Sequence, residues 1–179
     1  MVDSLVERRI LKPAIGYAEY RNLLNVFVDS VQQEQGDQVV SVVLYGSVAR
    51  GTAGPGSDVD LLLILREAPL EYWKRLQPLL RVLRRLRKEQ CWKTLEEQGW
   101  TPFVSVMVLS LEEAKQNRYL YLDMLDEAKI LVDKDGFFRA KLASLRQRLK
   151  ELGAKKVQRN GGWYWDLKPD LKQGEALVL

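Results

Sequence analysis

Residues 44–65 read LYGSVARGTAGPGSDVDLLLIL, a glycine-rich turn between two apolar segments. The run that precedes the turn, over 39–45, is rich in valine, and the run that follows it, over 58–65, is leucine-rich beyond two aspartates. Short continuous apolar runs bounded by turn residues are typical of buried strands. The stretch therefore predicts two strands joined by a turn that lies beside a pair of acids.

The acid pair is Asp58 and Asp60. Residues two apart in a strand face the same side, with Cα atoms about 6.5–7 Å apart. Two carboxylates placed in this way repel each other unless a cation lies between them. Hard oxygen ligands suit magnesium or manganese, with room left for water and phosphate oxygens. We therefore predict that Asp58 and Asp60 are both the metal ligands and the catalytic residues.

The turn before the acids has the features of a phosphate site. Gly46 allows the backbone to approach a phosphate closely. Ser47 can donate its hydroxyl to the same phosphate, and backbone N–H groups at a helical start near Ser47 favour an anion. Arg50 would lie one turn along that helix. The sequence thus predicts a phosphate-binding turn next to a metal site.

The combined pattern resembles the signature of the nucleotidyltransferase superfamily that includes DNA polymerase β and kanamycin nucleotidyltransferase. It is most similar to the minimal, prokaryotic MNT-type members. In that signature an apolar strand leads to Gly-Ser, a loop of about ten residues and Ser-Asp-x-Asp opening another strand. The matching positions are Gly46, Ser47, Gly51, Ser57, Asp58 and Asp60.

The resemblance implies a magnesium-dependent enzyme that moves a nucleoside monophosphate from a nucleoside triphosphate to an acceptor hydroxyl. It assigns the nucleotide to Gly46, Ser47, Arg50 and Ser57, and Mg²⁺ or Mn²⁺ to the acid pair. It also implies a small mixed β-sheet packed with helices. We expect residues 1–134 to form this domain, with a C-terminal helix and an aromatic tail, residues 135–179, packed on it.

One element departs from the family pattern. Active members have a third carboxylate on a later strand, but the segment 103–110, FVSVMVLS, has only Ser105 as a polar residue in mid-strand. Either an acid from a neighbouring element replaces it, or the strand alignment is wrong and Asp133 faces the site, or the site binds metal and nucleotide without efficient transfer. The acids left open are Glu112, Glu113, Asp123 and Asp133.

The third of these readings gives an alternative function. MNT-type proteins often act beside a helical HEPN protein as the antitoxin half of a toxin–antitoxin pair. The resemblance therefore also implies a catalytically weak nucleotide-binding protein with a HEPN-type partner.

Other nucleotide and hydrolase motifs do not match. No Lys-Ser or Lys-Thr follows the glycines, so there is no Walker A loop. The glycines at 51, 54 and 56 do not give G-x-G-x-x-G. The chain has no histidine, which excludes Ser-His-Asp catalysis and histidine-based zinc sites.

Hydrophobic periodicity predicts the remaining elements. Four helices are expected, the second with a break at Pro78, together with two further short strands. Ser110 and Glu113 should form a capping box, and the glycine- and proline-punctuated end should be irregular. The helices are predicted over 17–35, 69–98, 111–125 and 137–152, and the strands over 102–110 and 130–132.

Composition sets wider limits. The single cysteine, Cys91, suits the cytoplasm, and no apolar run reaches the roughly 18 residues of a membrane span. The 28 basic residues against 24 acidic ones give a mildly basic chain. A triphosphate is itself a polyanion, so nucleic acid is allowed as a partner but not required. The helix over 137–152 could add to a subunit interface, as in a homo-oligomer.

Two surface features have two interpretations each. The basic residues of the second helix are either a solvated face or a surface that steers nucleotide or RNA. The aromatic residues of the tail either hold it against the core or stack on a base. These residues are Arg81, Arg84, Arg85, Arg87 and Lys88 in the helix, and Trp163, Tyr164 and Trp165 in the tail.

Overall fold

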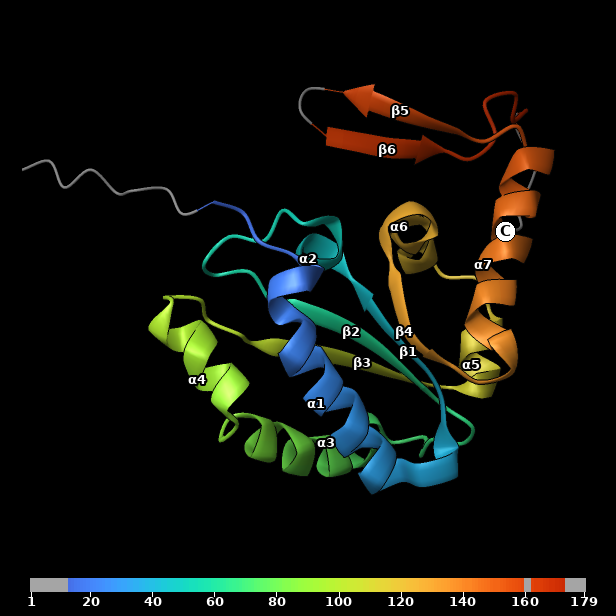
Figure 1. Ribbon diagram of the computed structural model, residues 1–179. Helices are drawn as coiled ribbons and strands as arrows, with labels where there is room; N and C mark the ends of the chain where they lie inside the picture. The colour runs from blue at the N-terminus through green and yellow to red at the C-terminus, as the bar shows by residue number, and fades with distance from the viewer. Residues whose placement is uncertain (1–12, 160–161, 173–179) are drawn as a thin grey trace, which may run out of the picture.

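A four-stranded mixed sheet is the centre of the molecule (Figure 1). The computed structural model describes residues 13–159 and 162–172. The strand order is β3-β2-β1-β4; β1 pairs antiparallel with β2 and β4, and β2 pairs parallel with β3. The strands are β1 Val39–Tyr45, β2 Val59–Leu65, β3 Val104–Ser110 and β4 Lys129–Asp133. The predicted α/β fold with a small mixed sheet is confirmed.

Helices cover both faces of this sheet (Figure 1). The helices of one face are α1 Tyr17–Gln35, α3 Tyr72–Leu86 and α4 Gln90–Glu97. Those of the other face are α5 Leu111–Lys115, α6 Tyr119–Glu127 and α7 Phe137–Glu151. The short helix α2, Gly46–Arg50, follows β1 directly, and 3-10 turns occupy Gly36–Gln38 and Lys134–Gly136.

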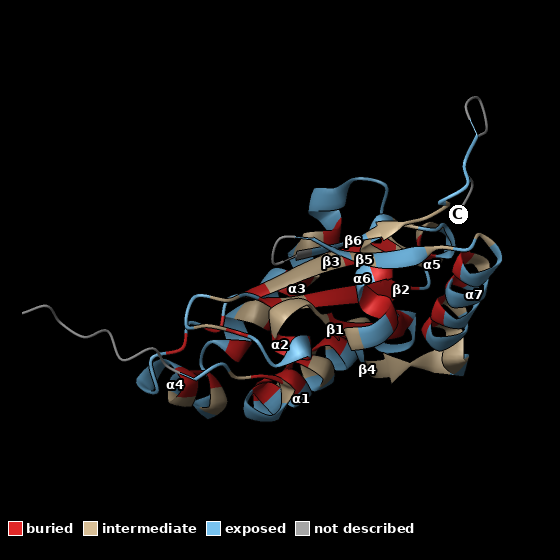
Figure 2. Ribbon diagram, turned by 90° about the horizontal axis from the view of Figure 1, so that it is seen from above, coloured by how far each residue is buried: buried red, intermediate tan, exposed pale blue. Residues whose placement is uncertain are grey.

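Alternation along β2 decides which face carries the acids. Leu61 and Leu63 belong to the core under α1 and α3, whereas Leu62 and Ile64 belong to the core under α6 and α7. Side chains alternate along a strand, so Asp60 lies on the same side as Leu62, the α6 side. All four of these side chains are buried, so both faces of β2 are apolar beyond Asp60 and its sequence is a continuous apolar run (Figure 2).

Three expectations for the other elements are wrong. Pro78 lies inside α3, and the break comes instead at 87–89, because the apolar face continues past the proline through the buried Leu79 and Val82. The helix predicted over 111–125 is divided into α5 and α6. The tail forms a hairpin of β5 Lys155–Arg159 and β6 Gly162–Asp166. In the described ranges no helix is both long and apolar enough to cross a membrane.

The capping box at the start of α5 is confirmed, and it is joined to a buried arginine. The Ser110 hydroxyl accepts from the Glu113 N–H at 3.2 Å, and the Glu113 carboxylate accepts from the Ser110 N–H at 2.8 Å. Arg75 donates two hydrogen bonds to that carboxylate, at 2.7 and 3.0 Å, and a third to the Val108 carbonyl at 3.2 Å. The Arg75 side chain is 4% exposed, so Glu113 neutralises a buried charge.

Replacing Glu113 should destabilise the fold in a pH-dependent way. The Arg75 guanidinium lowers the pKa of Glu113 from 4.5 to about 2. This stabilisation is therefore complete above about pH 4.5 and is lost as the pH falls through about 2. We expect Glu113→Gln to lower the free energy of unfolding by about 2 kcal/mol near neutrality, less than for a fully buried pair because Glu113 is partly exposed.

Urea unfolding across the acidic range measures this effect. The difference between wild type and Glu113→Gln should shrink as the pH falls below about 4.5. Glu112→Gln is the matched control, because the Glu112 side chain is 77% exposed. A Glu113→Gln protein as stable as the Glu112→Gln control would contradict the role of this ion pair.

Candidate active site

The turn after β1 and the acid that opens β2 are in direct contact. Tyr45, the last residue of β1, pairs with Asp60 in the sheet, so Gly46 begins α2 beside the Asp60 carboxylate. Gly46 has φ +74°, and a Cβ there would lie 2.3 Å from Asp60 Oδ2. Only glycine fits this backbone conformation and this spacing. The predicted phosphate turn and the predicted acid pair therefore form one site.

Hydrogen bonds within the chain fix the loop between α2 and β2. The Thr52 N–H donates to the Ser47 carbonyl at 2.9 Å, and Gly51 ends α2 in the left-handed conformation. The Ser57 hydroxyl accepts from the Gly54 N–H at 2.9 Å, and the Ser57 N–H donates to the Gly54 carbonyl at 3.0 Å. Ser57 thus shapes the loop, and its role in nucleotide binding stays a prediction.

The electrostatics of the acid pair fit a cation site. Burial raises the pKa of Asp60, the Asp58 carboxylate raises it further, and Arg50 acts in the opposite direction. Burial and then the charge of Asp60 raise the pKa of the neighbouring Tyr45 hydroxyl. Asp58 is exposed and Asp60 is half-buried, so one side of the pair is open to solvent. A divalent cation would relieve the repulsion.

Comparison with known proteins shows the family of this chain. The sequence profile described as the nucleotidyltransferase domain matches residues 24–169. The chain belongs to this family. A provisionally named protein adenylyltransferase of Methanocaldococcus jannaschii is 33% identical over 132 residues, which cover 73% of this chain and 84% of that protein.

Solved structures show weaker likeness. A toxin–antitoxin structure with AMP-PNP has a TM-score of 0.44 and 18% identity, covering 71% of this chain and 89% of that one. A Shewanella oneidensis tri-AMPylated HEPN toxin in complex with an MNT antitoxin gives a TM-score of 0.38 and 15% identity. The match covers 75% of this chain and 88% of that one.

In this nucleotidyltransferase the residue beside Asp60 on β3 is Ser105, as the register shows. Of the acids left open by the sequence, Asp133 is excluded from the site. It lies opposite Ser41, about 13 Å along β1 from Tyr45. There it accepts hydrogen bonds from the Ser41 hydroxyl and from the first N–H groups of α7. The idea that a shifted strand alignment brings Asp133 to the site is therefore wrong.

Glu112 and Glu113 also lie at the wrong end of the sheet. They follow Ser110, which is five residues, or about 17 Å, along β3 from Ser105. Asp123 is on α6, which packs against α2. Within residues 13–159 and 162–172, no three His, Cys, Asp or Glu side chains form a metal-binding cluster. The acid pair therefore suits a metal whose other ligands are phosphate oxygens and water.

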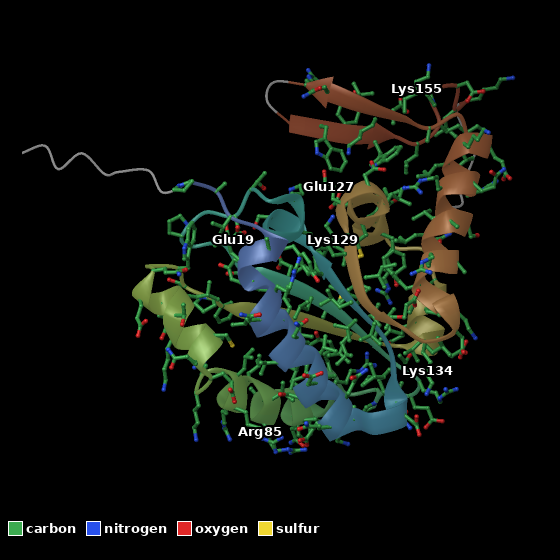
Figure 3. The ribbon with its side chains drawn as sticks, viewed as in Figure 1. Glu19, Arg85, Glu127, Lys129, Lys134 and Lys155 are labelled. Atoms are coloured by element: carbon green, nitrogen blue, oxygen red, sulfur yellow. The ribbon has the colours of Figure 1, made fainter. Side chains whose placement is uncertain are left out.

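Sequence reasoning missed Glu127. Its carboxylate forms an ion pair with Arg50 at 3.3 Å and links α6 to α2. Figure 3 labels Glu127 at the end of the molecule where the hairpin lies. Asp123 lies one helical turn before Glu127 on α6, and burial is the main cause that raises its pKa. The charge of Glu127 also raises this pKa, whereas the charges of Arg50 and Lys156 lower it. Arg50 therefore lies between the acid pair and the acids of α6. The i, i+4 spacing of Asp123 and Glu127 in the sequence indicates that the two acids share a helix face. It does not indicate that Arg50 packs against that face.

The basic helix lies far from this site. Arg81 and Arg85 on α3 form ion pairs with Glu34 on α1, and Arg87 lies over the Trp92 ring. Helix α3 covers the sheet face opposite to α6, and Arg85 is at the other end of the molecule from α2 (Figures 1 and 3). This arrangement favours the interpretation as a solvated face.

Proposed function

We propose that this nucleotidyltransferase transfers a nucleoside monophosphate from a magnesium–triphosphate complex to an acceptor hydroxyl. The observation that carries the proposal is the contact between Gly46 and the Asp60 carboxylate. It joins a turn suited to phosphate to an acid pair suited to a metal. The name of the M. jannaschii relative supports an adenylyl group and a protein acceptor.

Each part of the site has a role in this reaction. The backbone at Gly46 and the Ser47 hydroxyl bind phosphate oxygens, and Arg50 contributes positive charge beside them. Asp58 and Asp60 would hold magnesium, which would neutralise charge on the phosphates. The acceptor oxygen forms a bond to the α-phosphorus. The bond from this phosphorus to the oxygen that it shares with the β-phosphorus breaks, and pyrophosphate leaves. The acceptor proton passes to solvent water.

A second candidate function rests on Ser105. Its place beside Asp60 leaves β3 without the third carboxylate of active family members. Such a site would bind the magnesium–triphosphate complex and transfer slowly. The protein would then act mainly as an antitoxin-like partner of a helical HEPN protein. Co-purification from the native host tests that association, and a solitary protein there would count against it.

Triphosphate binding should depend on magnesium. Without the metal, Asp58 and Asp60 repel the phosphates across a short gap. We expect ATP to bind about tenfold or more tightly with Mg²⁺, and the bound complex to be more stable to heat by about 1.4 kcal/mol per tenfold in affinity at saturating ligand. The Mg²⁺ effect should vanish in Asp58→Ala/Asp60→Ala. Calorimetric titration with and without Mg²⁺ measures the affinity, and thermal unfolding of the complex measures the stability.

The control is Asp29→Ala/Asp37→Ala, which removes two exposed carboxylates from α1 and from the turn that follows it. It should keep the full magnesium effect. Equal affinity for ATP with and without Mg²⁺ in the wild type would overturn the metal site. Metal-dependent binding without pyrophosphate release over a broad acceptor panel would favour the second candidate.

A further inference from the structure

A groove runs between α6 and the C-terminal hairpin. It has a volume of about 500 Å³, and its walls include Tyr119 and Asp123 from α6 and Trp163 and Trp165 from β6. The hairpin projects over α6 on the α2 side of the molecule (Figure 1). The groove is therefore formed by the tail whose aromatic residues the sequence left with two interpretations.

Some aromatic residues of the groove hold the tail against the core, and others are free to stack on a base. Trp165 packs against the core under α6, so it holds the hairpin in place. Tyr119 and Trp163 are 74% and 38% exposed. The Lys156 ammonium lies 3.9 Å from the centre of the Trp163 ring, and it also pairs with Asp126 of α6 at 3.5 Å. Trp163 is thus held at the groove with its ring only partly covered.

One buried polar group of the groove lacks a partner among the described residues. The Trp165 Nε1–H is buried and has no hydrogen-bond acceptor within the described part of the chain. Buried donors without a partner are costly and uncommon in native structures. Burial raises the pKa of the Asp123 carboxylate in the same groove. A ligand with both a hydrogen-bond donor and an acceptor would match these two groups.

The groove and the phosphate turn both lie against α6, since α6 lines the groove and packs against α2. Tyr119, Asp123 and Glu127 are four residues apart, so they follow one face of α6. Glu127 forms the 3.3 Å ion pair with Arg50 of α2, and α2 begins at Gly46. A ligand whose phosphates lie at Gly46 would therefore reach Asp123 and Tyr119 with the part farthest from its γ-phosphate.

We propose that this groove binds the base of the nucleoside triphosphate and selects a base with an exocyclic amine. This inference rests on the proposed function. Trp163 and Tyr119 stack on the base, a contribution of about 1–3 kcal/mol per base. The Asp123 carboxylate accepts a hydrogen bond from the amine. A phosphate or carboxylate ligand does not fit, because Asp123 would repel it.

Two ligands with the same phosphates separate the groove from the metal site. Tripolyphosphate tests the phosphate turn and acid pair alone, and ATP adds the base. In Mg²⁺, we expect Trp163→Ala and Tyr119→Ala to weaken ATP about 5-fold to 100-fold, as the loss of one stacking contact implies. Tripolyphosphate affinity should not change. Trp163→Phe should recover most of the ATP affinity, because phenylalanine can also stack.

Trp73→Ala is the matched control, since Trp73 is a 59% exposed tryptophan on the distant helix α3. It should leave both ligands unaffected. ATP affinity unchanged in Trp163→Ala and Tyr119→Ala, or equal losses for ATP and tripolyphosphate, would overturn the groove assignment. Tripolyphosphate binding that ignores Mg²⁺ and the acid pair would instead overturn the proposed function.

Selectivity for the amine has its own test. Inosine triphosphate has a carbonyl where ATP has the exocyclic amine and otherwise matches it in shape. The wild type should bind ATP about tenfold more tightly than inosine triphosphate, since a charged hydrogen bond contributes about 1.5 kcal/mol or more. Asp123→Asn should bring the ratio close to one, because the amide can pair with either group. An ATP preference that survives Asp123→Asn would overturn the role of Asp123.

Discussion

Asp60→Asn should lower the rate of nucleotide transfer by about three orders of magnitude or more, because charge neutralisation by the metal accounts for most of catalysis in reactions of this kind. An amide occupies the same space as the carboxylate but has no charge to hold magnesium. Burial and then the Asp58 carboxylate raise the pKa of Asp60 in the wild type, and the substitution removes both of these costs. The free energy of unfolding should therefore be unchanged or slightly higher.

Labelled nucleotide and magnesium, incubated with candidate acceptors, give the transfer rate, and urea titration gives the stability. Asp58→Asn should behave in the same way. Asp29→Asn removes an exposed carboxylate from α1 and should keep full activity. Transfer by Asp58→Asn and Asp60→Asn at the wild-type rate would show that the acid pair is not the catalytic centre.

The part of this site that lies within one stretch of sequence could be predicted. Gly46 to Asp60 spans fifteen positions by number, and strand alternation alone places Asp60 on one face and Leu61 on the other. The elements around it are equally local: the predicted bounds of α1 and β1 agree with the structure, and β2 begins one residue later than expected. Local periodicity and turn chemistry are enough for such features.

Partners that are distant in the chain could not be predicted. Arg50 and Glu127 are 77 residues apart, and Arg75 and Glu113 are 38 apart. Both pairs depend on how helices pack on the sheet. The position of a third carboxylate could not be predicted for the same reason. The register of β2 with β3 and of β1 with β4 decides which acids face Asp60, and these strands are distant in the chain.

The hairpin was missed for a different reason. The sequence of β5, KKVQR, has one apolar residue, so it shows no alternation that would indicate a half-buried strand. A better signal was present: Asn160-Gly161 lies between β5 and the aromatic β6, and Asn-Gly is the most typical two-residue hairpin connection. Turn chemistry, rather than hydrophobic pattern, would have predicted this element.

Gly46→Ala should reduce both activity and stability. Its φ of +74° is unfavourable for alanine, and the new Cβ would lie 2.3 Å from Asp60 Oδ2 and 3.2 Å from its Cγ. We expect the free energy of unfolding to fall by about 2 kcal/mol or more. We expect transfer to fall about as far as in Asp60→Asn, because the carboxylate must move away from the phosphate turn. Gly56→Ala is the control in the same loop, since a Cβ there meets nothing within 4 Å.

A double-mutant cycle separates the two causes of this destabilisation. Asp60→Ala shortens the side chain that the new Cβ would meet, and leaves the backbone strain at position 46. If the contact matters, Gly46→Ala should lower the free energy of unfolding less in the Asp60→Ala background than in the wild type. The difference between the two losses should be about 1 kcal/mol or more. Additive losses would mean that the strain at φ +74° accounts for the whole effect. The activity loss of Gly46→Ala would then require another cause, since Asp60 would not have been displaced.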